Sequence, residues 1–156
     1  MPKFKNWTEL EAYLQNHVAR TIAKSAEVER VLAEVMSQAV IDVVYGAYEP
    51  TQYDRRGDEE GLSDTRNMGI TDYGIRDDGT VFITFENLTE GADSLQGKYL
   101  TDTIVEGIEA NWNNSNGVWA EPRDFVGETA NRLRANPTEL MNAFRSGLLA
   151  RGFKIK

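Results

Sequence analysis

The stretch from residue 8 to residue 45, TELEAYLQNHVARTIAKSAEVERVLAEVMSQAVIDVVY, decides the first part of the fold. Its apolar residues recur three and four positions apart, which is the period of an amphipathic helix. Neither Gly nor Pro interrupts it, so the pattern predicts one long helix over 8–45, with a kink near Ser25. Such a helix would be roughly 55 Å long. Because a domain of this size cannot cover that length, part of the apolar stripe is expected to meet another subunit.

Both ends of this stretch carry signals of helix boundaries. Thr8 and Glu11 have the spacing of a capping box, which predicts that the helix starts at Thr8. Gly46 follows the last apolar residue, and Pro50 lies shortly beyond it. Gly is common just after a helix and Pro cannot continue one, so the helix is expected to end at residue 45.

A long polar segment, YEPTQYDRRGDEEGLSDTRNM, follows at residues 48–68. A loop of about twenty residues is unusual inside a compact domain and is more often functional or disordered than incidental. Tyr and Arg are enriched at protein–protein contacts. Tyr48, Tyr53, Arg55 and Arg56 therefore predict an extended contact loop over 46–66, to which Leu62 would also contribute.

The remainder of the chain, 67–156, mixes strand and helix signals. Two alternating stretches, at 67–76 and 81–85, flank Asp77-Asp78-Gly79, which predicts a β-hairpin. Residues 103–106 are rich in β-branched side chains and favour a strand, although the apolar spacing also fits a helix. Asp124 is a candidate N-cap for a helix that Asn136-Pro137 ends, and a last helix is expected to end at Gly152. Together these elements predict a single α+β domain over 1–156.

Composition excludes several classes of protein. The 156 residues suffice for one domain with a core of its own. No apolar run is long enough to span a membrane, and none follows the first lysines as in a secretory signal. The chain has no Cys, which excludes disulfides and thiol catalysis. The formal charge of −8 argues against sequence-specific or general nucleic-acid binding.

The sequence carries few groups suited to catalysis. His17 is the only histidine, so neither a His-based metal site nor a Ser-His-Asp triad is expected. The densest acidic cluster, Asp58-Glu59-Glu60, does not have the ligand spacing of an EF-hand loop. No nucleophile elbow, phosphate-binding loop or His-Glu-x-x-His motif is found. We therefore expect a protein that is not an enzyme and needs no cofactor or metal.

Four motifs follow one another along the chain. The helix of 8–45 runs directly into Tyr48-Glu-Pro. The loop contains Tyr53-Asp-Arg-Arg-Gly and then Gly61-Leu-Ser-Asp. Downstream lie Ile104-Val-Glu-Gly and Trp119-Ala-Glu-Pro-Arg-Asp-Phe. In this order the four motifs resemble the small neck or tail-completion proteins of long-tailed bacteriophages and their prophages. The last motif departs from the family pattern, which often reads Pro-Arg-Pro-Phe, because Asp124 replaces its second proline.

This resemblance implies a non-enzymatic structural protein of the virion, assembled in the bacterial host cytoplasm. It implies an α+β subunit that forms a homo-oligomeric ring at the head–tail junction, with other neck, portal-adaptor and tail proteins as partners. DNA would pass through the ring lumen, and an acidic lumen would not retain it. Three further residues of the matching motif, Trp119, Arg123 and Phe125, join the loop residues as candidate interface residues.

Three other hypotheses remain open at the level of sequence. The chain could be a minor tail or capsid-associated protein. It could be a soluble, phage-encoded acidic protein that binds and inhibits a host factor, which its net charge permits. It could also be a metal-dependent hydrolase built on the carboxylates of Asp58, Glu59, Glu60 and Asp64.

Overall fold

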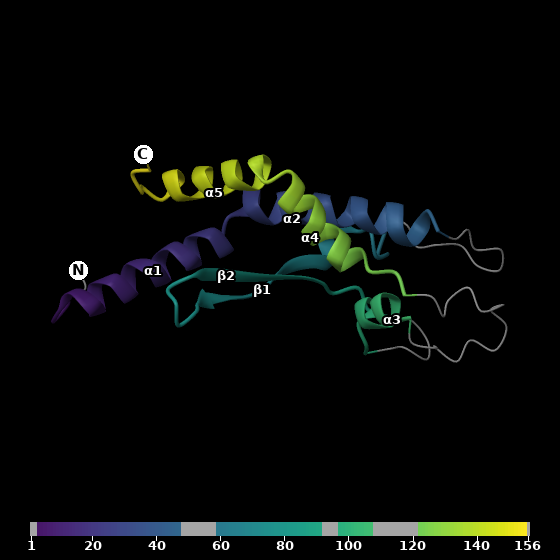
Figure 1. Ribbon diagram of the computed structural model, residues 1–156, viewed down its shortest axis with the longest axis horizontal. Coiled ribbons are helices and arrows are strands. Elements are labelled where there is room, and N and C mark those ends of the chain that lie inside the picture. The colour runs from purple at the N-terminus through teal and green to yellow at the C-terminus, as the bar shows by residue number, and fades with distance from the viewer. Residues whose placement is uncertain (1–2, 48–58, 92–96, 108–121, 156) are drawn as a thin grey trace. The chain divides into compact units, whose positions relative to one another are not determined.

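The computed structural model describes residues 3–47, 59–91, 97–107 and 122–155. Within these ranges helices predominate, and two strands form one antiparallel sheet (Figure 1). The α+β class expected from the sequence is confirmed. No helix within the described ranges combines the length and the apolar character needed to cross a membrane.

The long helix expected over 8–45 is divided into three consecutive segments. These are α1 (Trp7–Ala23), α2 (Ala26–Ala39) and a π-helix, η1 (Val40–Tyr45). Lys24 leaves the helical conformation, and Ser25 directly precedes α2, where its Oγ accepts a hydrogen bond from Val28 N at 3.4 Å. The predicted kink is therefore at the right place, but a continuous helix is wrong. Ser25 works as an N-cap, a position that Ser favours as strongly as any residue.

The start of α1 differs by two residues from the predicted capping box. The N-cap is Asn6, whose Oδ1 accepts from Glu9 N at 2.8 Å. Glu9 Oε2 in turn accepts from Lys5 N at 2.8 Å. An Asn at the N-cap is at least as favourable as a Thr, so Asn6 starts the helix before Thr8 can.

The predicted hairpin is confirmed. β1 (Met68–Ile75) and β2 (Val81–Asn87) are neighbours in the sheet. Between them, Arg76 N donates to Thr80 O and Gly79 N donates to Arg76 O, both at 2.9 Å. Gly79 has a φ of +82°, a backbone conformation in which Gly is not strained.

The predicted strand at 103–106 is wrong, because this stretch belongs to a helix, α3 (Leu100–Glu106). Gly107 ends α3 with a φ of 65°, as expected of a C-cap glycine. The Thr101 hydroxyl donates to Asn87 O at 2.9 Å, which attaches the first turn of α3 to the end of β2. These tertiary contacts override the β propensity of the threonines.

The predicted C-terminal helices are confirmed as α4 (Phe125–Ala135) and α5 (Thr138–Ala150). Asp124 caps α4, its Oδ1 accepting from Gly127 N at 2.7 Å. Gly152 follows α5 with a φ of +85°. A short 3-10 helix, η2 (Thr65–Asn67), precedes β1 directly.

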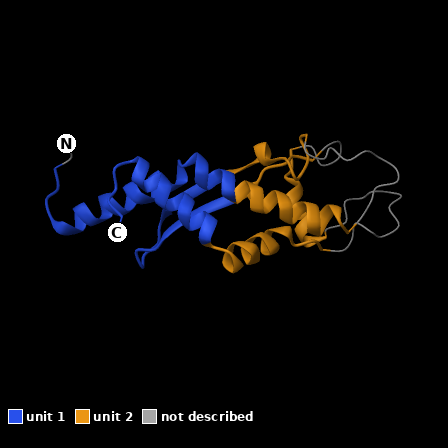
Figure 2. Cartoon of the chain, turned by 90° about the horizontal axis from the view of Figure 1, so that it is seen from above, with its two compact units in different colours: residues 1–31, 70–85, 138–156 blue, residues 32–69, 86–137 orange. Residues whose placement is uncertain are grey.

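The chain divides into two compact units (Figure 2). Unit 1 comprises residues 1–31, 70–85 and 138–156, and unit 2 comprises residues 32–69 and 86–137. In unit 1, α1 packs against α5. The described residues of unit 1 bury few side chains: Ala19, Thr21, Val28, Val31 and Ala143. Most of these are small, so unit 1 has a thin core.

Unit 2 has the larger core. Its buried apolar residues are Leu32, Ala33, Met36, Ala39, Val40, Val44, Leu62, Met68 and Phe125. α4 packs against η1, and Arg132 of α4 joins the two. Its Nη2 lies 2.9 Å from Asp42 Oδ2 on η1, and its Nε lies 2.7 Å from Glu128 Oε1. Hydrogen bonds from Arg132 and Gln38 lower the pKa of Asp42.

Candidate functional site

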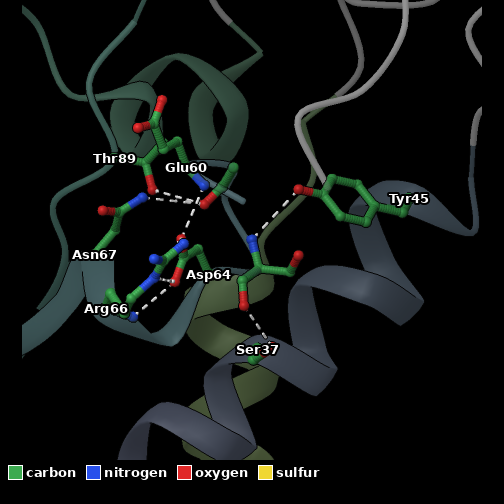
Figure 3. A network of polar contacts seen from close by, with 9 residues as sticks. Ser37, Tyr45, Glu60, Asp64, Arg66, Asn67 and Thr89 are labelled. Atoms are coloured by element: carbon green, nitrogen blue, oxygen red, sulfur yellow. Dashed lines mark hydrogen bonds and ion pairs between the residues drawn. The ribbon is translucent and has the colours of Figure 1, made fainter. Parts of the chain in front are cut away.

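A polar network in unit 2 holds the described end of the predicted contact loop (Figure 3). Its centre is Asp64, the N-cap of η2. The Asp64 carboxylate accepts from Glu60 N at 2.8 Å and from Arg66 N at 2.9 Å. Glu60 itself has a φ of 58°, which is unusual for a residue with a side chain. The carboxylate thus fixes a tight turn between residues 60 and 66.

Arg66 completes the coordination of this carboxylate. Its Nη2 lies 2.7 Å from Asp64 Oδ2, and its Nε lies 3.0 and 3.1 Å from the two oxygens. The Asp64 side chain is only 4% exposed, whereas that of Arg66 is 70% exposed. The Arg66 guanidinium and the two backbone N–H donors hold the pKa of Asp64 well below its usual range. Asp64 is therefore a charged structural group whose acceptor sites are already occupied.

Two buried residues at the end of β2 hold the preceding part of the loop. Asn87 Nδ2 donates to Leu62 O at 2.7 Å, and its Oδ1 accepts from the Thr89 hydroxyl at 2.6 Å. Thr89 Oγ1 also lies 3.3 Å from Gly61 O. Buried polar groups are costly unless they are paired. This pairing fixes residues 61–62 against the strand end.

Ser63 connects the same turn to the helical segment that precedes the loop. The Ser37 hydroxyl of α2 donates to Ser63 O at 2.7 Å. Ser63 N donates to the Tyr45 hydroxyl of η1 at 3.3 Å. Residue 45, where the helix ends, and residue 63, near the end of the predicted loop, are therefore held side by side.

The predicted interface residues fall into two groups. Tyr48, Tyr53, Arg55, Arg56 and Trp119 lie outside the described residues. Leu62, Arg123 and Phe125 are buried in unit 2, Phe125 completely. Arg123 N donates to Ile104 O at 3.0 Å, which joins the start of α4 to α3. The structure thus places Leu62, Arg123 and Phe125 in the core of unit 2.

The described carboxylates considered for a metal site, those of Glu59, Glu60 and Asp64, are not placed together to hold a metal ion. Asp58 lies outside the described residues, Glu59 and Glu60 are exposed, and Asp64 is buried under Arg66. In the part of the chain that the structure describes, no group of three or more His, Cys, Asp or Glu side chains is placed to hold a metal ion. His17 lies between two aromatic rings, 6.1 Å from Tyr13 and 5.4 Å from Phe153 between centroids.

Unit 1 buries few side chains but exposes several large apolar ones. Trp7 is 84% exposed, and Tyr13 and Leu14 of the same helix are also exposed. On α5, Met141 and Leu149 are exposed as well. Single exposed apolar residues are normal, but several on packed neighbouring helices suggest a surface that meets another protein.

Sequence reasoning did not identify Asn87 and Thr89 as parts of the site. They lie 25 and 28 residues from the loop residues that they hold. In the sequence they are an ordinary polar pair after a strand. Gly61-Leu-Ser-Asp was singled out, and the structure makes this segment the centre of the network.

The described residues therefore form an α+β protein whose ordered polar site fixes a loop and whose exposed apolar residues are concentrated in unit 1. The family model of YomN matches residues 6–150, so the chain belongs to the YomN family. No curated protein and no solved structure gave a significant match to the chain.

Proposed function

We propose that this protein is a non-enzymatic structural subunit of a tailed-phage virion, which forms a homo-oligomeric ring at the head–tail junction. The YomN family derives from phages and prophages of Bacillus, which agrees with a phage origin. The four sequence motifs that resemble neck and tail-completion proteins supply the more specific part of the proposal.

The observation that carries the proposal is the exposed apolar surface of unit 1. The first two turns of α1 contribute no buried residue, yet they carry Trp7, Tyr13 and Leu14. Exposed apolar side chains of this kind add little to the stability of a single subunit. In an assembly, each of them would be covered by a neighbouring subunit, and burying a large apolar side chain stabilises by about 1.5–3 kcal/mol.

The loop network supports a second contact. Residues 45 and 63 are fixed side by side through the Tyr45 hydroxyl and Ser63 N. These contacts fix the positions at which the chain leaves η1 and returns at Ser63. Tyr48, Tyr53, Arg55 and Arg56 are proposed to reach a neighbouring subunit from there, as aromatic and Arg side chains often do at interfaces.

The state of Asp64 favours an architectural role over a role as a general acid or base. A general acid or base works with a pKa near the working pH. The pKa of Asp64 is instead lowered, further away from neutral pH. Its oxygens accept hydrogen bonds from Arg66 and from backbone N–H groups. Its chemistry suits the fixing of a turn.

A soluble acidic protein that binds a host factor is the second candidate function. The formal charge of −8 supports it, because an acidic surface can compete for a basic nucleic-acid site. A minor tail or capsid-associated subunit would use the same exposed apolar residues of unit 1 in another part of the particle.

The test is negative-stain electron microscopy with mass photometry on the purified protein, alone and mixed with phage heads or tails. We expect rings, or added density of defined stoichiometry at one end of a head or tail. Trp7→Ala with Leu14→Ala should abolish that density, whereas Glu11→Ala on the same helix should preserve it. A monomer that decorates neither heads nor tails would contradict the proposal, and a pull-down from host lysate would then test the second candidate function.

A further inference from the structure

The two units differ strongly in charge. Unit 1 contains ten Lys and Arg residues and eight Asp and Glu residues, which gives a formal charge of +2. Unit 2 contains seven Lys and Arg residues and 17 Asp and Glu residues, which gives −10. The net charge of −8 therefore comes entirely from unit 2. A molecule with this distribution can attract a second copy of itself when the unlike units approach.

In unit 1, α5 presents an apolar stripe with a positive charge at its centre. Met141, Arg145 and Leu149 are spaced four residues apart and lie on one side of the helix. All three are exposed, whereas Ala143 on the other side is buried. Arg151 follows just beyond the helix and is also exposed. Among the described residues, no ion pair involves Arg145 or Arg151.

In unit 2, α3 presents a stripe of complementary chemistry. Asp102 and Glu106 are four residues apart, so they share one side of α3, and Tyr99 is the N-cap residue just before the helix. All three are exposed, and Tyr99 is 51% exposed. The residues between them are at least partly covered. The two stripes are of similar length, about 12 Å on α5 and about 10 Å on α3 at the rise of an α-helix.

We propose that copies of this chain associate head to tail, with the α5 stripe of one copy bound to the α3 stripe of the next. Arg145 and Arg151 would face Asp102 and Glu106, and Met141 or Leu149 would pack on the Tyr99 ring. Because the two stripes are different surfaces, each copy keeps one free stripe after binding. Such heterologous contacts continue into a ring or a filament.

Contact between two α5 stripes is the competing arrangement, and it is less favourable. It would be isologous, with Arg145 and Arg151 of one copy close to the same residues of the other. Like charges placed together across an interface are destabilising. This proposal rests on the self-assembly proposed above. The contact between α5 and α3 can nevertheless be shown wrong without contradicting the role in the virion.

The test is a charge-reversal experiment read by sedimentation velocity over a range of concentrations at low salt. Arg145→Glu with Arg151→Glu should raise the dissociation constant of self-association at least about tenfold, and so should Asp102→Lys with Glu106→Lys. An equimolar mixture of these two variants should restore association, because both contacts again join unlike charges. About 0.5 M salt should weaken the association of the unmodified protein.

Two further variants serve as controls. Arg20→Glu with Lys24→Glu makes the same change in net charge at two exposed residues, one in the last turn of α1 and one at its C-cap, and should leave the association unchanged. Asp102→Asn with Glu106→Gln removes the two negative charges of α3 without introducing lysine. It should also weaken association, which separates the loss of charge from any disturbance of α3 by the lysine side chains. Circular dichroism verifies that each variant is folded.

Several outcomes would overturn the inference. The unmodified protein could remain monomeric at low salt. Only the α5 variant, and not the α3 variant, could weaken association. The mixture of the two variants could fail to regain association. Binding of duplex DNA by the α5 stripe without self-association would also overturn it. In each case, decoration of heads or tails in the electron microscope still tests the proposed function separately.

Discussion

Asp64 buries its carboxylate beneath the guanidinium of Arg66, two residues further along the chain, with 2.7 Å between Oδ2 and Nη2. The pair is asymmetric, because the carboxylate is shielded and the guanidinium faces solvent. The ion pair and the two backbone N–H donors together define the turn that carries Leu62 and Ser63.

Asp64→Asn is expected to lower the free energy of unfolding at neutral pH. The folded protein lowers the pKa of Asp64 below its ordinary value of 3.8. Because the pKa is lower in the folded protein, the charged form stabilises the fold when the pH is above the pKa of the unfolded state. This stability is lost as the pH falls towards the pKa of the folded state. The difference in the free energy of unfolding between wild type and variant should thus be largest above about pH 5 and decrease below about pH 4. Chemical denaturation from pH 2 to 7 measures it, and a constant difference would contradict the assignment.

Asn87→Ala is expected to cost about 1–3 kcal/mol, because it leaves Leu62 O without its buried donor and the Thr89 N–H without its acceptor. Amide hydrogen exchange should accelerate at residues 61–64 more than elsewhere in unit 2. The exposed Asn142→Ala on α5 is the matched control and should change stability by less than about 0.5 kcal/mol. Equal effects of the two substitutions would argue against the network.

Phe125→Ala should destabilise by about 3–5 kcal/mol, because the ring is fully buried and its removal leaves a cavity. The neighbouring Val126→Ala removes an exposed side chain and should cost less than about 1 kcal/mol. Urea denaturation of the two variants provides the comparison. A small effect of Phe125→Ala would show that this residue is not in the core.

Gly147→Ala tests the packing of α5 on the start of α2. A Cβ at Gly147 would lie 2.8 Å from Ser25 Oγ and 3.1 Å from Ser25 Cβ. Overpacking of this kind costs about 1–3 kcal/mol, against a gain in helix propensity of about 1 kcal/mol. We expect a net loss of stability.

Ser25→Gly removes both of the crowded atoms and costs only a few tenths of a kcal/mol as an N-cap change. The double variant should therefore be more stable than Gly147→Ala alone. A double-mutant cycle measured by thermal unfolding gives the coupling energy. Additive effects of the two substitutions would contradict this contact.

Local signals were sufficient wherever one short motif determines an element. Asp77-Asp78-Gly79 placed the hairpin, and Asp124 placed the start of α4, because a turn and an N-cap each depend on a few adjacent residues. The break in the long helix was predicted only as a kink. Neither Gly nor Pro marks it, and the hydrogen bond that fixes it is accepted by the side chain of Ser25, a residue that helices also tolerate internally.

Contacts between distant residues explain what the sequence did not predict. Residues 103–106 favoured a strand, yet they lie in a helix whose first turn is held by the Thr101 hydroxyl, which donates to Asn87 O, 14 residues away. The loop network likewise depends on Asn87, Thr89 and Ser37, which have no motif in common. Leu62 and Phe125 were assigned to an interface by residue type and by motif, and no local pattern distinguishes such a residue from one in the core.

The π-helical turn at Val40–Tyr45 has a consequence for how this gene can vary. A π-helix closes its hydrogen bonds one residue later than an α-helix, so it accommodates an additional amino acid in the turn. Deleting one codon there would restore α-helical hydrogen bonding and leave Tyr45 on nearly the same side of the helix, because the wider turn had made room for just one more residue. The Tyr45 hydroxyl would then still face Ser63 N. The same deletion within α2 would rotate every later residue by about 100° and turn this hydroxyl away. In-frame deletion of one codon should therefore be tolerated more readily at Val40–Tyr45 than at Ala26–Ala39.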